Sequence, residues 1–230
     1  TVQKRARRDA LHRNGNMSTS FSLTPGGQQL LLHPDLSLQL DAARLMIADV
    51  HIGKTMHFRK NGLGVPEQLA QEELDQLSRL VDRHQPRVLY VLGDLFHAQP
   101  NSEWDRLEKW LDRQGALSMK LIKGNHDRHA HLFVHDRFEL MDQVAFHGLR
   151  LCHEPSESPG EQFEICGHLH PTYLLKGQGK QSLKLPCFYL RKNQFILPAF
   201  GRFTGGWKIQ PQPGERIFLS TGRKVEALSL

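Results

Sequence analysis

"RVLYVLGD", residues 87 to 94, is an unbroken apolar run that stops at a glycine and an aspartate. A strand that is apolar at every position is typical of the buried centre of a parallel sheet. Similar segments lie on either side of it, at 43–51 ("ARLMIADVH") and 118–127 ("SMKLIKGNHD"). Helical periodicity fills the gaps, at 65–84 and 101–113. The order β-α-β-α-β predicts a parallel sheet covered by helices.

Short strands and turns replace the helical periods after residue 138. The apolar runs are "LRLCH" (149–153), "FEICGHLH" (163–170), "SLKLPCFYL" (182–190), "NQFILPAF" (193–200), "ERIFLS" (215–220) and "KVEALSL" (224–230). They indicate a second, mixed or antiparallel sheet stacked on the first. We therefore expect an α/β fold, a four-layer α-β-β-α sandwich whose second outer layer is thin. Residues 17–230 are expected to form one domain.

Charge sets the N-terminal segment apart from this domain. Residues 1–16 hold five Lys/Arg against Asp9, a net charge of +4 out of +6. We interpret 1–16 as a disordered, solvated tail, and a nucleic-acid-binding arm is the alternative. The rest of the chain carries only +2, with 25 basic and 23 acidic residues, so broad duplex binding is not expected.

The apolar runs and the cysteines indicate the cellular compartment in which the protein works. No apolar run reaches the roughly 20 residues that span a bilayer, and the N-terminus has no apolar signal core. Three cysteines, an odd number without metal-ligand spacing, favour buried free thiols. We expect a cytoplasmic protein without a membrane segment.

Metal-binding residue types follow five of the apolar strands. They are Asp49 and His51, Asp94 and His97, Asn125 and His126, His153, and His168 and His170. Carboxyl ends of neighbouring strands converge on one crevice, so these residues can meet in space. Each motif alone fits an ordinary turn or surface loop, but all five in order at strand ends indicate one site.

The residue types decide the chemistry of that site. Carboxylates, an amide carbonyl and several imidazoles form a mixed oxygen and nitrogen site for two divalent ions, unlike a structural zinc site of thiolates. Two such ions can clamp a phosphate and activate water at neutral pH. In this arrangement Asn125 is a ligand and His126 faces the phosphate.

The pattern D-x-H, G-D, G-N-H-D, H, G-H-x-H over residues 49–170 resembles that of the calcineurin-like metallophosphoesterases. The resemblance implies that Asp94 bridges two metals and that His126 contacts the phosphate and protonates the leaving oxygen. The remaining implied ligands are Asp49, His51 and His170 for one metal, and Asn125, His153 and His168 for the other.

The fourth motif departs from the family. Gly-His is usual there, whereas this chain has Cys152-His153, and His147 competes for the role. His147 precedes its strand and His153 follows it, on the expected ligand edge. We therefore assign His153.

Longer runs narrow the resemblance. "ADVHIGK" and "GDLFH" are similar to SbcD-type DNA nucleases, which implies that His97 assists cleavage; a hydrogen-bonded loop histidine is the alternative. "ADVHIGKTMHFRKNGLGVP", "LGDLFHAQPNSEW" and "CHEP" are more similar to PdeM-type ligase-associated DNA damage response endonucleases. That resemblance, over most of residues 20–210, implies a manganese-dependent phosphodiesterase acting on DNA. It also implies functional association with an ATP-dependent DNA ligase, a helicase and an exonuclease.

Two loop residues are candidates for substrate binding. Arg59 and Lys60 follow the first ligands and could hold backbone phosphates. The low charge of the domain favours single-stranded DNA, since a flexible strand can bend one phosphate onto the metals. A small-molecule phosphodiesterase or phosphomonoesterase, for example one acting on cyclic nucleotides, would use the same metals and remains the alternative. A non-catalytic scaffold is disfavoured because all seven ligands are present.

Overall fold

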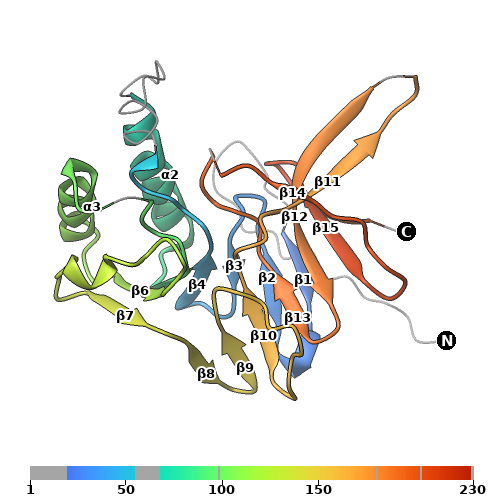
Figure 1. Ribbon diagram of the computed structural model, residues 1–230, viewed down its shortest axis with the longest axis horizontal. Helices are drawn as coiled ribbons and strands as arrows, with labels where there is room; N and C mark the ends of the chain where they lie inside the picture. Colours follow the sequence, from blue (N-terminus) through green and yellow to red (C-terminus); the bar gives the residue numbers. More distant parts are fainter. Residues whose placement is uncertain (1–19, 55–67, 98, 180, 203, 229–230) are drawn as a thin grey trace.

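In the residues that it describes, this computed structural model consists of two β-sheets packed face to face, with α-helices on the outside of the first (Figure 1). It describes residues 20–54, 68–97, 99–179, 181–202 and 204–228. No helix in this described part is both long and apolar enough to cross a membrane.

The first sheet has seven strands in sequence order. They are β1 (Phe21–Leu23), β2 (Leu30–Leu32), β3 (Leu38–Gln39), β4 (Arg44–Ile47), β5 (Val88–Leu92), β6 (Ser118–Ile122) and β7 (Phe138–Met141). Strands β4 to β7 pair in parallel. Helices α2 (Gln68–His84) and α3 (Ser102–Arg113) make the crossovers. The predicted β-α-β-α-β order is confirmed.

Strand β7 differs from the prediction. The sequence pattern placed the change of architecture at residue 138, but Phe138–Met141 extends the first sheet in parallel with β6. A four-residue edge strand without alternation gives little periodic signal. The second sheet therefore begins only at β8 (Val144–Phe146).

The second sheet is mixed, as expected. Its remaining strands are β9 (Leu149–Leu151), β10 (Phe163–Cys166), β11 (Pro171–Lys176), β12 (Ser182–Arg191), β13 (Gln194–Ile196), β14 (Trp207–Lys208), β15 (Arg216–Ser220) and β16 (Val225–Leu228). Strand β10 lies parallel to β9 and β13, whereas β12 is antiparallel to β11, β13 and β15. Beyond the body of the sheet, β11 and β12 continue as a two-stranded arm (Figure 1).

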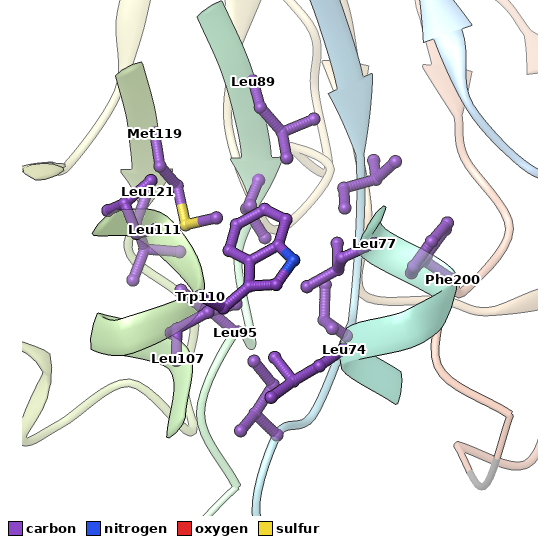
Figure 2. Packing of buried hydrophobic residues seen from close by; sticks show 14 of the residues in the cluster. Leu74, Leu77, Leu89, Leu95, Leu107, Trp110, Leu111, Met119, Leu121 and Phe200 are labelled. Atoms are coloured by element: carbon purple, nitrogen blue, oxygen red, sulfur yellow. The ribbon is translucent and has the colours of Figure 1, made fainter. Parts of the chain in front are cut away.

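Buried side chains form three layers of core. The first lies between the helices and the first sheet, where Trp110 sits among leucines of both helices and of the strands (Figure 2). The indole nitrogen of Trp110 donates to Ser78 Oγ of α2 at 2.8 Å, which satisfies its buried polar atom. Trp104 of α3 is also buried, and its ring stacks on Phe96.

The second and third layers lie on opposite faces of the second sheet. Phe188 and Phe218 pack against residues of the first sheet. Their neighbours along the strands, Cys187 and Ile217, belong to the outer cluster. The outer layer is thin, as predicted, and in the described residues it contains no α-helix. The sandwich thus holds the carboxyl ends of β4, β5, β6, β9 and β10 at one edge.

Candidate metal centre

Backbone hydrogen bonds tie together the loops that follow β4, β5, β9 and β10. Asp49 N donates to Gly93 O at 3.1 Å, and His51 N donates to Asp94 O at 2.8 Å. Across the two sheets, His168 N donates to the Asp49 carboxylate at 3.0 Å. The two halves of the sequence pattern therefore meet at one edge.

Left-handed backbone is concentrated at this edge. Five of the seven predicted ligands have positive φ: Asp49 (54°), His51 (57°), Asp94 (50°), His168 (69°) and His170 (47°). Such conformations are uncommon for residues other than glycine and cost of order 1–3 kcal/mol each. They persist because the surrounding sheet and hydrogen bonds hold them, and they turn the polar side chains inward.

Two glycines make room for the polar side chains. A Cβ at Gly93 would overlap the imidazole of His153, and one at Gly124 would overlap the Asp94 carboxylate and backbone nitrogen. Close approach thus requires glycine in both "GD" and "GNHD", and at Gly93 the positive φ of 81° requires it as well.

Two overlapping groups of side chains bring their donor atoms within 4.8 Å of one another. The groups are Asp49, His51 and His170, and Asp49, Asp94 and His153. Both carboxylates are almost fully buried, with 0% of Asp49 and 3% of Asp94 exposed. Buried carboxylates this close together need positive charge nearby.

Hydrogen bonding fixes the proton on His153. Its Nδ1 lies 3.0 Å from Leu92 O, a carbonyl that can only accept, so Nδ1 carries the hydrogen. Its Nε2 points the other way and lies 3.0 Å from Asn125 Oδ1 and 3.6 Å from Asp94 Oδ2. An imidazole nitrogen, an amide oxygen and a carboxylate oxygen, all of which can bind a divalent cation, are thus brought together.

The ring of His51 lacks the hydrogen bonds expected of a buried imidazole. Neither ring nitrogen has a partner among the described residues. Burial, followed by the charges of Lys54 and neighbouring histidines, lowers the pKa of His51 to about 2, so the ring is neutral. A metal ion would satisfy its lone pair.

A carbonyl also orients His170. Thr204 O accepts from Nδ1 at 3.1 Å, and Nε2 lies 3.2 Å from Asp49 Oδ1. Burial alone would lower the pKa of His170, but the hydrogen bond and charge of Asp49 raise it. A proton on Nε2 thus occupies the place that a cation would take beside Asp49.

Sequence reasoning gave no role to Asp127. This carboxylate is fully buried and accepts hydrogen bonds from Phe96 N at 2.9 Å and Gly124 N at 2.8 Å. It ties the loop after β5 to the loop after β6, and burial raises its pKa to about 6. The available signal was the acid that ends "GNHD", directly after the predicted ligand Asn125 and His126.

His126 and His97 lie beside the ligands. The His126 ring is exposed, and its centroid lies 5.2 Å from that of His51 and 5.2 Å from that of His97. His126 N donates to Asp94 Oδ1 at 2.9 Å, so the backbone fixes its position. His147 lies exposed in the turn before β9, away from this group.

Of the remaining predicted site residues, one lies in the group of ligands and two are not described by the structure. His168 lies with the other predicted ligands, since its Nδ1 is 3.1 Å from His153 Nε2. Arg59 and Lys60 fall outside the described residues.

Comparisons with known proteins agree with this geometry. Residues 44–191 match the family model "Calcineurin-like phosphoesterase". Among solved structures, the nuclease MPE of Pseudomonas putida is 31% identical, with a TM-score of 0.74 over 91% of this chain and 100% of that chain. No curated protein matched.

The matched segment begins in β4 and ends with β12, so it contains every strand end that carries a predicted ligand. It spans well over half of the chain. The protein therefore belongs to the calcineurin-like phosphoesterase family and is a hydrolase that acts on phosphoric esters.

Proposed function

We propose that this protein is a manganese-dependent, two-metal phosphodiesterase that cuts single-stranded DNA internally. One observation carries the proposal: His153 Nε2, an atom type that binds divalent ions, lies 3.0 Å from Asn125 Oδ1 and 3.6 Å from Asp94 Oδ2, two oxygens that bind them as well. The 31% identity to a nuclease supports a phosphodiester as the substrate.

The donor set fits two divalent ions. Asp49, His51 and His170 would hold one ion, and Asp94 would bridge to the second. The remaining ligands of the second ion would be Asn125, His153 and His168. Mixed carboxylate, amide and imidazole ligands suit Mn²⁺ better than Mg²⁺, which prefers oxygen ligands and water. Bound ions would supply positive charge to the phosphate and lower the pKa of water.

The protein's own side chains would handle the leaving group. His126 is exposed next to the ligands, so its ring can reach the phosphate and give a proton to the departing oxygen. His97 stacks on His126, with 23° between the ring planes, and would orient it. Arg59 and Lys60 stay predicted contacts to backbone phosphates.

A role in DNA repair follows from the resemblance to ligase-associated endonucleases. Under this proposal the protein works in the cytoplasm with an ATP-dependent DNA ligase, a helicase and an exonuclease. The single-strand preference rests on flexibility, because a rigid duplex must distort to bring one phosphate down to buried ligands.

The test uses chelator-treated enzyme reloaded with Mn²⁺ or Mg²⁺. We expect Mn²⁺ to restore opening of a closed circular single strand, with supercoiled and linear duplexes cut at least about tenfold more slowly. Mg²⁺ should restore much less activity, because imidazole nitrogens are poor ligands for it. Gel analysis of nicked and linear products measures both preferences.

Each part of the proposal can fail separately. An intact circle would refute endonuclease action, and equal rates on duplex would refute the strand preference. Equal rescue by Mg²⁺ would refute manganese dependence. Fast turnover of cyclic nucleotides or a phosphomonoester, with DNA untouched, would favour the small-molecule alternative.

A further inference from the structure

Positive charge is concentrated in one part of the chain. Between Glu164 and Glu215 lie 50 residues without a single Asp or Glu. They contain seven basic residues: Lys176, Lys180, Lys184, Arg191, Lys192, Arg202 and Lys208. The low net charge of the domain thus hides a segment of +7, balanced by −5 over the rest of residues 17–230.

Strand register brings three of these lysines onto one face. Lys184 pairs with Leu174, Lys176 with Ser182, and Lys208 with Thr172. Paired residues of neighbouring strands lie on the same face, as do alternate residues of one strand. Lys176, Lys184 and Lys208 therefore share the face of β14, β11 and β12 that also carries Thr172. We call these three residues the lysine face.

The opposite face of the same strands is occupied. Tyr173, Leu175 and Leu185 pack against the outer core cluster. The lysine face is turned away from that cluster, and all three of its lysines are exposed. The residues from Thr172 to Lys176 extend it over about 13 Å.

A groove connects the lysine face to the metal centre. Its volume is about 430 Å³, and its lining includes His170, Thr172 and Lys184. This is within the usual range for sites that hold a small ligand or one unit of a larger one. Lys184 Nζ donates to Gly206 O at 3.0 Å, which holds the ammonium group at this groove. Arg202, also in the lining, is paired with Glu72.

We propose that the lysine face binds the phosphates of single-stranded DNA next to the phosphate being cut. The inference rests on the proposed nuclease function. Three exposed lysines on one face, from a segment of the sequence without Asp or Glu, suit the binding of a polyanion. The groove is lined by His170, one of the predicted metal ligands, as well as by Lys184. A strand held there would continue along the β11–β12 arm seen in Figure 1.

The test replaces all three lysines, as K176A/K184A/K208A. A matched triple variant, K109A/K192A/R223A, removes three exposed charges from α3, from the β12–β13 turn and from the β15–β16 turn. Kinetics are measured with Mn²⁺ on an oligothymidylate and on bis(p-nitrophenyl) phosphate, which is too small to reach the arm. Light scattering reports the oligomeric state.

For the lysine-face variant we expect KM for the oligonucleotide to rise at least about tenfold near physiological salt. The slope of log KM against log salt should fall by about 2, since each contact to a single strand contributes about 0.7. The ratio of kcat/KM on the oligonucleotide to that on the small diester should fall at least about tenfold. The matched variant should keep this ratio within about twofold.

Other outcomes separate this inference from the function on which it rests. If wild type cuts the small diester but no DNA, the proposed function is wrong. If wild type cuts DNA and the ratio is unchanged in the lysine-face variant, this inference alone is wrong. A changed oligomeric state with an unchanged ratio would make the face an interface between copies. If loss of the Lys184 hydrogen bond lowers the melting temperature, K176E/K208E provides the same test with Lys184 intact.

Discussion

Asp94→Ala is expected to remove nearly all hydrolysis of every phosphoester substrate. Its carboxylate lies between the two groups of ligands, with Oδ2 at 3.6 Å from His153 Nε2 and 3.8 Å from His51 Nε2. A bridging ligand shared by two ions supports several kcal/mol of charge stabilisation, which corresponds to a loss of about 10³-fold or more in rate. Initial rates on DNA and on a small diester measure the effect.

The control for Asp94 is Asp142→Ala, an exposed carboxylate just after β7 that should leave rates near wild type. The melting temperature of Asp94→Ala should change little in chelator, because the loss of the hydrogen bond from His126 N is offset by the removal of one of two crowded buried carboxylates. Activity within tenfold of wild type would contradict the two-metal account.

His126→Ala is expected to slow phosphodiester cleavage by roughly 10²–10⁴-fold while keeping both ions, the range typical of a lost acid-base group. Its side chain is exposed next to the ligands, whereas its backbone nitrogen, which the substitution keeps, holds Asp94 Oδ1 at 2.9 Å. The single-turnover rate of the purified variant should therefore fall, whereas its manganese content should stay at the wild-type value.

His147→Ala is the matched control, since His147 is an exposed histidine at the far end of β9. It should behave as wild type, which would also test the choice of His153 over His147. Loss of one manganese ion from His126→Ala would make His126 a ligand and refute its role as an acid.

The sequence was sufficient to predict the layout of the site because parallel strands impose it. Apolar runs that end in polar residues predict strand ends at one edge, so Asp49, Asp94 and Asn125 could be brought together without coordinates. The position of His153 followed from the same reasoning, because it comes after its strand whereas His147 comes before.

Contacts that depend on tertiary structure could not be predicted in this way. Asp127 contacts two loops through backbone nitrogens, which no residue pattern specifies. The Thr204 carbonyl that orients His170 comes from 34 residues further along the chain. The lysine face depends on the register of three strands, so net charge alone concealed it.

The contacts of the cysteines were likewise not predictable from the sequence. The three thiols are free and buried, as expected. No residue pattern indicated that Cys152, which directly follows β9, and Cys166, at the end of the neighbouring β10, would have Sγ atoms 3.5 Å apart. With Glu164 they form a third group of donor atoms within 4.8 Å. Glu164 is already engaged by Arg150, Ser156 and Gln194, so the metal centre is assigned to the other two groups.

Anomalous scattering from crystals grown with Mn²⁺ tests the two-metal centre most directly. The account predicts two peaks about 3.5–4 Å apart, the distance typical of two-metal phosphoesterase sites. One should lie among Asp49, His51 and His170, and the other against Asn125 and His153, with Asp94 between them. A single peak, or manganese at Cys152 and Cys166 instead, would contradict it.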